Sequence, residues 1–422
     1  MSAHNGSSAW SSRTASPWRW VTEVALSGYL LTVPLGRGVP EWLREVLLLG
    51  LFGGMAVSRW PGSGHRAAPE PFGLLLPLVL FALSTLVSTV LSVTPLESMT
   101  RITYLPIALV VFFATQDVLS DPPAHLRLRL VLAAIILGLG LDGLYQFWTG
   151  RSLLGETPLA EGARYRISAS LPSPTDLALI PIFLPVALSA VARLRRGWAA
   201  VVLLAGLPPV LATTILSGTR TAWLALLVGL GTLGVLGRQR RIAAAVLVVA
   251  VVLALVAYGL GVGAVRERAA KLLDVSRDAR IGQWLVAWQM FKESPLLGKG
   301  VEAYGELYLP YLRKVSLPTG YAPEVAPILW PHNIYLELLA ERGLLGALAF
   351  GTLVTAMGVR LRRGLAPDAP AETRTLAAGF AASLACFLTV GVFDLSFQKD
   401  WALLAFFVLA ALIARLPSGG VS

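Results

Sequence analysis

One histidine and several arginines are the residues of this chain best suited to chemistry on a charged substrate. The chain contains four histidines in 422 residues, and His332 stands directly before Asn333 and a long apolar run. A histidine titrates near neutral pH and can accept a hydroxyl proton as a general base. The alternative is a surface or capping histidine without a chemical role. Asn333 is predicted to cap the following helix and to lie beside any substrate that His332 contacts.

Arginines in the polar segments between apolar runs indicate a site for a phosphate-containing anion. The planar guanidinium forms bidentate, charge-assisted hydrogen bonds with phosphate. The alternative is that individual arginines reach toward lipid head groups. The arginines concerned are Arg101, Arg164, Arg166, Arg220, Arg277 and Arg280.

The segment LSGTRTAWLAL gathers hydrogen-bond donors where a helix is predicted to begin. It contains Ser217, Thr219 and Arg220 within one tight turn. The free backbone N–H groups at a helix start, together with the helix dipole, favour an anion. We therefore predict that these three residues bind the anionic substrate.

Two aspartates are further candidates. Asp176 follows Pro174 and Thr175 in the segment ISASLPSPTDLALI, and we assign it to substrate binding. Asp142 lies inside an apolar run, where a charge is costly and tends to mark function. We expect it to pair with one of the arginines and support the site; the alternative is a local pair without a catalytic role.

No metal or other cofactor is expected. The single cysteine, Cys386, excludes an internal disulfide and a cysteine-cluster metal site. His332 is the only histidine in a segment predicted to face outward, which excludes a multi-histidine site. The outward carboxylates are scattered, whereas Mg²⁺ needs one or two of them beside a substrate phosphate.

Composition predicts an all-α integral membrane protein. Hydrophobic residues make up 55% of the chain and charged residues 14%, with a mean hydropathy of +0.69. A soluble protein would have about 25% charged residues, and apolar stretches near 20 residues are typical of membrane helices. The net charge of +11 is explained by basic loops on one side of the membrane, so we expect no nucleic-acid partner.

Apolar runs predict about twelve transmembrane helices. The predicted segments are 21–36, 43–58, 72–93, 102–115, 128–148, 175–192, 198–216, 221–236, 242–264, 333–359, 375–393 and 401–414. Most arginine-rich loops then fall on the same side as both termini, and the positive-inside rule makes that side cytoplasmic. The N-terminal segment lacks the pattern of a cleaved signal peptide, so none is expected.

Two long loops, 149–174 and 265–332, are predicted to lie outside. Long loops in compact proteins are usually functional or disordered, and the aromatic residues of the second favour an ordered one. We accordingly divide the chain into a bundle of about nine helices (1–264), a large, partly helical periplasmic loop between the ninth and tenth helices (265–332), and about three C-terminal helices (333–422).

Within the second loop, RIGQWLVAWQMFKESPLLGKG (280–300) predicts an amphipathic helix that ends at Ser294-Pro295. The helix lies in the membrane interface or packs on the bundle. The segment 298–300 is predicted to be a turn. After His332, charged residues at 337, 341 and 342 place the start of the bilayer core near Gly343, with His332 at the outer surface.

Four segments resemble, in order, the motifs of the O-antigen ligase and polymerase superfamily. They are RYRISASLPSPTDLA, LSGTRTAWLAL, RIGQWLVAWQMFKESPLLGKG and HNIYLELLAERGLLG, which together span about residues 160–350. Thr219 stands where the family often has serine, Ala169 replaces a glycine, and Thr175-Asp176 replaces a region with asparagine. The resemblance therefore extends to Arg220, Arg280 and His332 more closely than to Arg166 and Asp176.

The resemblance implies a GT-C-like, inverting and metal-independent glycosyltransferase of the bacterial inner membrane, with a periplasmic active site. Its donor would be an O-antigen linked to undecaprenyl diphosphate. A ligase transfers this glycan to a sugar hydroxyl of lipid A-core, and a polymerase transfers it to another O-unit. Overall resemblance and compact size favour the ligase. In this mechanism Arg220 and Arg280 stabilise the diphosphate, and His332 accepts the proton of the acceptor hydroxyl or orients that hydroxyl.

Other functions remain open at the level of sequence. A flippase or transporter of the same lipid is typically built from repeated halves with charges near the midplane, and neither is found. A structural assembly partner would not need the arginines. Within the enzyme class, the four motifs do not separate a ligase from a polymerase or, more distantly, a protein O-oligosaccharyltransferase. The oligomeric state is not predicted.

Overall fold

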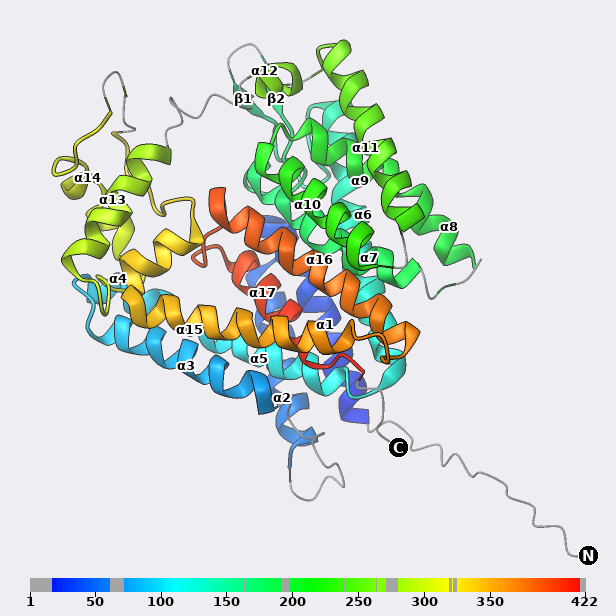
Figure 1. The fold of residues 1–422 in the computed structure, drawn as a ribbon, viewed down its shortest axis with the longest axis horizontal. Coiled ribbons are helices and arrows are strands. Elements are labelled where there is room, and N and C mark those ends of the chain that lie inside the picture. The colour runs from blue at the N-terminus through cyan, green and yellow to red at the C-terminus, as the bar shows by residue number, and fades with distance from the viewer. Residues whose placement is uncertain are drawn as a thin grey trace, which may run out of the picture.

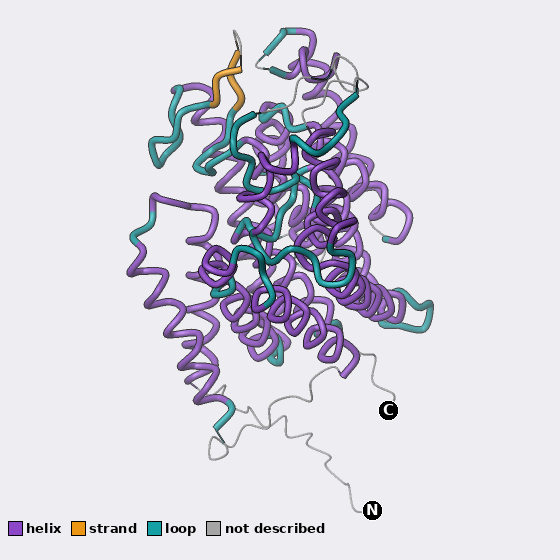
Figure 2. The backbone as a smooth tube through the Cα atoms, turned by 90° about the vertical axis from the view of Figure 1, so that its left-hand side faces the viewer, coloured by secondary structure: helices purple, strands orange, loops and turns teal. Residues whose placement is uncertain are grey.

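The computed structural model describes residues 17–60, 72–161, 164–191, 194, 197–237, 240–262, 264–270, 280–318, 321 and 325–417. Most of these residues are helical (Figures 1 and 2). The helices are α1 (Pro17–Thr32), η1 (Val33–Gly38), α2 (Glu41–Ser58), α3 (Phe72–Val90), α4 (Pro95–Arg101), α5 (Tyr104–Val118), α6 (Pro122–Thr149), η2 (Pro174–Ala178), α7 (Leu179–Val191), α8 (Trp198–Ala205), α9 (Leu207–Leu216), α10 (Arg220–Leu236), α11 (Arg240–Gly259), α12 (Val265–Ala270), α13 (Arg280–Glu293), α14 (Ala303–Leu312), α15 (Ile334–Gly364), α16 (Ala371–Phe393) and α17 (Asp400–Ala414). One antiparallel hairpin, β1 (Leu159–Glu161) with β2 (Arg164–Arg166), lies in the first long loop.

The prediction of an all-α membrane protein is supported. A helix occupies each of the twelve predicted segments. Within the described residues, seven helical segments are long and apolar enough to cross a membrane, so the number of crossings stays a prediction. These seven are Gly73–Val90, Pro95–Val118, Pro122–Thr149, Pro174–Val191, Arg240–Gly259, Ile334–Gly364 and Ala371–Phe393.

Helix α17 forms the centre of the bundle. Every residue from Trp401 to Ala414 is buried, as expected for a helix that is apolar on all sides. It packs against α5, α15 and α16, and α16 in turn packs against α7 and α10. Within the second long loop, α13 and α14 form a separate lobe, which Figure 1 shows beside the bundle at the end away from the start of α1.

Helix α15 is broken at Gly343. Figure 1 shows a short yellow limb that meets a long orange limb at a sharp angle. The backbone groups freed by the break are paired with the segment that follows α13: Leu344 N donates to Pro295 O at 2.8 Å, Lys299 N to Ala340 O at 2.9 Å and Gly300 N to Glu341 O at 3.0 Å. Non-helical backbone at membrane depth is tolerated only where such groups are satisfied within the protein.

Glycines on both sides allow this backbone-to-backbone contact. Gly343 has φ +61° and ψ −161°, a conformation that is essentially restricted to glycine. A Cβ on Gly343 would lie 2.4 Å from the carbonyl carbon of Leu296, and one on Gly298 would lie 2.2 Å from that of Glu341. The segment 295–300, of which only residues 298–300 were predicted, as a turn, is therefore the part of the loop that holds the lobe on α15.

Replacing Gly343 with alanine should lower the melting temperature of the detergent-purified protein. The strained backbone alone costs about 1–3 kcal/mol, and the added Cβ also collides with Leu296. Gly351→Ala is the matched control, because a Cβ there meets no atom within 4 Å and alanine favours a helix by about 1 kcal/mol. Equal melting temperatures for the two variants would contradict the backbone contact.

Candidate active site

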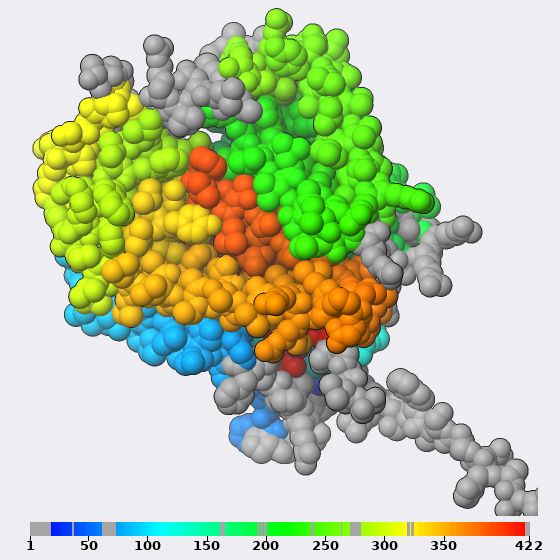
Figure 3. All heavy atoms as spheres, in the orientation of Figure 1, coloured from blue at the N-terminus to red at the C-terminus, as the bar shows by residue number. Residues whose placement is uncertain are grey.

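The surface is hollowed between the lobe of α13 and α14 and the helices α10 and α11. Figure 3 shows this hollow between the yellow-green and green parts of the molecule, with orange-red atoms near the end of α16 beneath it. Near the end of α16, three polar side chains come together from distant parts of the chain: Arg280, the first residue of α13; His332, which precedes α15; and Asp394, which follows the last residue of α16.

Asp394 lies between the other two. His332 Nδ1 is 3.3 Å from Asp394 Oδ1, and Arg280 Nη2 is 3.6 Å from Asp394 Oδ2. The Asp394 side chain is only 2% exposed, whereas those of His332 and Arg280 are 27% and 22% exposed. The carboxylate is thus buried behind a histidine and an arginine that both reach the hollow.

Local structure fixes the histidine. His332 has φ +51°, an unusual conformation for a residue other than glycine, which turns the chain just before α15. The next residue, Asn333, caps α15: its Oδ1 accepts hydrogen bonds of 3.0 Å from Tyr335 N and from Leu336 N. The predicted cap is confirmed. The ring of Trp330 packs edge-on against His332 at a centroid distance of 5.9 Å.

Neighbouring positive charges keep Asp394 ionised. Burial raises the pKa of this carboxyl group, but the hydrogen bond with His332 and the charges of Lys399 and Arg280 outweigh burial and hold the pKa below its usual value. An ionised carboxylate accepts the proton of His332 Nδ1, which leaves the lone pair on Nε2. This is the arrangement that orients a histidine as a general base.

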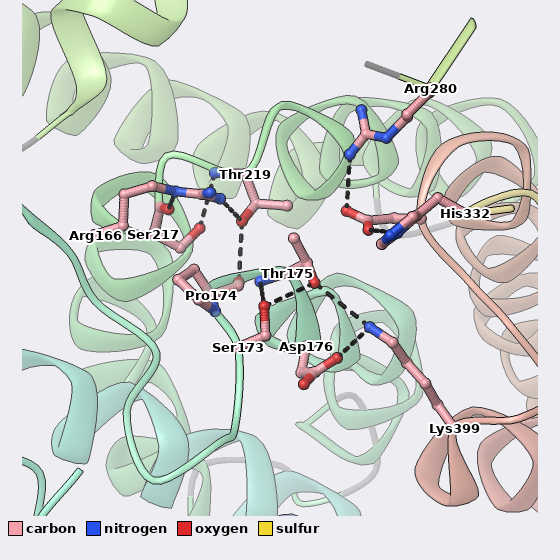
Figure 4. A network of polar contacts seen from close by, with 11 residues as sticks. Arg166, Ser173, Pro174, Thr175, Asp176, Ser217, Thr219, Arg280, His332 and Lys399 are labelled. Atoms are coloured by element: carbon pink, nitrogen blue, oxygen red, sulfur yellow. Dashed lines mark hydrogen bonds and ion pairs between the residues drawn. The ribbon is translucent and has the colours of Figure 1, made fainter. Parts of the chain in front are cut away.

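A second polar cluster faces the first. Lys399 Nζ donates to Asp176 Oδ1 at 2.7 Å and lies 3.5 Å from Thr175 Oγ1. Asp176 is 4% exposed and also accepts a 3.2 Å hydrogen bond from Trp401 Nε1. Figure 4 shows Lys399 and Thr175 across from His332 and Arg280. Lys399 connects the two clusters, because its Nζ lies 5.5 Å from the ring centroid of Trp330, the residue that packs on His332.

Arg166 builds the turn that precedes α10. Its Nε donates to Ser217 O at 2.8 Å and its Nη2 to Thr219 Oγ1 at 3.0 Å. Thr219 Oγ1 in turn donates to Pro174 O at 2.9 Å. Arg166 is 7% exposed, and Ser217 and Thr219 are 0% and 2% exposed. These predicted substrate ligands are therefore placed in a buried network that shapes the wall of the site (Figure 4).

Arg220 follows this network as the first residue of α10. Its side chain is half-buried, and its position at the start of a helix agrees with the prediction. The turn Ser217–Thr219, held by Arg166, fixes where α10 begins and thus where the guanidinium of Arg220 emerges. Arg220 thus begins α10, and Arg280 begins α13.

Two of the predicted site residues have other partners. Arg101 Nε donates to Glu302 Oε1 at 2.8 Å, and its Nη1 lies 4.0 Å from Asp400 Oδ1; it lines a separate cavity with Arg342 and Gln398. Within the described part of the chain, Asp142 does not form the expected pair with an arginine. Asp142 accepts hydrogen bonds from Leu153 N at 2.7 Å and Ser170 Oγ at 2.5 Å, because the first long loop folds back over the end of α6.

Sequence reasoning missed Asp394 and Lys399. Both lie in the segment DLSFQKD (394–400), between two apolar runs. With twelve predicted helices this short loop falls on the same outer side as His332. Its three charged residues between the eleventh and twelfth predicted helices were the signal that could have identified it.

Comparison with known proteins agrees with the motif resemblance. Residues 199–351 match a family model described as "O-Antigen ligase". The match includes Arg220, Arg280 and His332. No curated protein matches the chain.

Proposed function

Since residues 199–351 match a family model described as "O-Antigen ligase", we propose that the chain belongs to the O-antigen ligase and polymerase superfamily and is an O-antigen ligase of the bacterial inner membrane. It transfers a glycan from undecaprenyl diphosphate to a sugar hydroxyl of lipid A-core at the periplasmic face. The contact of His332 with a buried, ionised Asp394 carries this proposal, because glycan transfer to a hydroxyl needs a base.

In the proposed reaction, His332 Nε2 accepts the proton of the acceptor hydroxyl. The hydroxyl oxygen attacks the anomeric carbon of the donor glycan, and the new glycosidic bond forms on the opposite face from the leaving group. The bond from that carbon to the phosphate oxygen breaks, and undecaprenyl diphosphate leaves with the electron pair. His332 then releases its proton to solvent.

The cations of the site stabilise the leaving group. Negative charge grows on the bridging phosphate oxygen as the bond breaks, and fixed positive groups aimed at it lower the barrier. Arg220 and Arg280 supply guanidinium groups, which match the geometry of phosphate. Lys399, held by Asp176 at 2.7 Å, adds a third cation on the opposite side of the site.

Arg220→Ala should lower transfer by about 10²–10³-fold, the usual effect of removing one donor that stabilises developing charge. The rate is measured with purified protein at saturating acceptor. Arg240→Ala is the matched control: Arg240 also begins a helix, α11, and is exposed, but it lies at the far end of α10 from Arg220. Equal rates for the two variants would remove Arg220 from the site.

The proposed function is tested with purified protein, EDTA and undecaprenyl-diphosphate-linked glycan, offered lipid A-core or a second glycan-lipid as acceptor. Glycan on lipid A-core supports a metal-independent ligase. Growth of the chain on the lipid carrier instead means a polymerase. Absence of transfer to either acceptor, by protein that binds the donor, favours a transporter and contradicts the proposal.

A further inference from the structure

We propose that Glu337 and Glu341, two carboxylates inside the first limb of α15, are positioning residues that hold Asp394 against His332 during transfer. The inference rests on the proposed function. Both residues are 0% exposed, and neither contacts the Arg280–Asp394–His332 cluster itself. They act through the loop between α16 and α17, residues 394–399, which carries Asp394 and Lys399.

The two glutamates anchor this loop at consecutive residues. Glu337 Oε1 accepts a 3.1 Å hydrogen bond from Phe397 N. Glu341 Oε1 accepts a 2.7 Å hydrogen bond from Gln398 Nε2. The anchored residues therefore lie in the loop that carries Asp394, whereas the side chain of Lys399 is held separately by Asp176 at 2.7 Å.

Helical spacing places the anchors on the same face as the cap. Asn333, Glu337 and Glu341 are four residues apart, so they lie above one another on α15. His332 directly precedes Asn333, the N-cap of the same limb. The first limb of α15 thus fixes both groups. Its N-terminus fixes His332, and its glutamate side chains fix the loop that carries Asp394.

Burying the carboxylates of Glu337 and Glu341 is an inefficient way to stabilise the fold. Arg342 Nη1 lies 3.9 Å from Glu337 Oε1 and 3.7 Å from Glu341 Oε2, and the Arg342 side chain is 6% exposed. Two buried carboxylates therefore share one guanidinium. Buried ion pairs often contribute less stability than apolar side chains of the same volume, so the gain here is the fixed geometry of the loop.

The same turn of α15 also fixes the third member of the cluster. The backbone oxygen of Glu341 accepts hydrogen bonds from Gly300 N at 3.0 Å and from Ser88 Oγ at 2.6 Å. Gly300 ends the segment that follows α13, and α13 begins at Arg280. The limb of α15 consequently holds all three elements that meet at the active site, and a shift of its glutamates would separate Asp394 from His332.

The test compares Glu337→Met, which removes the acceptor at similar volume, with Glu337→Gln, which retains an acceptor oxygen. We expect Glu337→Met to lower kcat at least about tenfold, because small misplacements of catalytic groups have such effects, with an unchanged KM for the donor. Glu337→Gln should restore most of the rate. Glu306→Ala, an exposed glutamate on α14, is the control and should match the wild type.

A double-mutant cycle shows whether Glu337 acts through Asp394. In an Asp394→Asn background, Glu337→Met should cause no further loss, because the partner it positions is already disabled. If the losses of kcat in the two single variants multiply in the double variant, the two residues act independently and the proposal is overturned. A Glu337→Gln enzyme as slow as Glu337→Met would also overturn it. Gln398→Leu removes the second anchor and provides the same comparison if Glu337→Met is not recovered folded.

The failure of this inference and that of the proposed function give different results. A wild-type protein that binds the donor but transfers no glycan contradicts the proposed function. A wild-type protein that transfers glycan, with Glu337→Met equally active, contradicts only the positioning role.

Discussion

His332→Ala is expected to lower glycan transfer by about 10²–10⁴-fold, the contribution of a well-placed general base, while donor binding stays unchanged. The reason is geometric: His332 Nδ1 faces Asp394 at 3.3 Å, so the reactive Nε2 lone pair belongs to a ring of fixed orientation, and alanine leaves no group to accept the proton. Single-turnover transfer to the acceptor, measured beside donor binding to the same preparation, separates the two effects.

The control for this experiment is a second histidine. His125 lies in the first turn of α6, and His125→Ala should transfer glycan at the wild-type rate. A His332→Ala enzyme with near-normal single-turnover transfer would remove His332 from the mechanism. Loss of donor binding in the same variant would assign His332 to the donor site instead.

Asp394→Asn is expected to lower kcat by about 10²-fold or more with little change in KM for the donor. Asparagine has the same size but can offer its N–H₂ group to Nδ1, which places the ring proton on Nε2 and blocks the base. It also leaves Arg280, 3.6 Å away, without its anionic neighbour. The measurement is a steady-state comparison of wild type and variant at saturating acceptor.

The matched control is Asp368→Asn, the same substitution at an exposed residue between α15 and α16. It should leave kcat unchanged. Because neighbouring charges hold the pKa of Asp394 below its usual value, the carboxylate stays ionised through the neutral and mildly acidic range. An equal kcat for Asp394→Asn and wild type at pH 7 would show that the buried carboxylate does not assist the histidine.

The helices could largely be predicted from the sequence because they are long apolar runs. Each of the twelve predicted segments contains a helix, and the predicted end of α13 at Ser294-Pro295 is confirmed by its last residue, Glu293. The break in α15 could not be predicted, because Gly343 stands within an apolar, helical pattern. Its conformation depends on contact with the segment 295–300. The hydrophobic pattern around Gly343 does not indicate this contact.

The site could be predicted in part. Residue type identified Arg280 and His332, and the structure brings them to opposite oxygens of one carboxylate. That carboxylate, Asp394, lies 62 residues after His332 along the chain, so the pairing depends on tertiary structure. Glu337 was expected near the outer surface because it is charged. It is instead buried beneath the loop 394–399, where its carboxylate accepts a hydrogen bond from Phe397 N.

The anomeric configuration of the new linkage is the most direct test of the claim that His332 activates the acceptor for a single displacement. The donor is supplied with one defined anomer of the sugar bound to diphosphate, and the product on lipid A-core is examined by NMR. A single displacement gives the opposite configuration in the product. Retention of the donor configuration would indicate a covalent glycosyl-enzyme and would contradict the role assigned to His332 and Asp394.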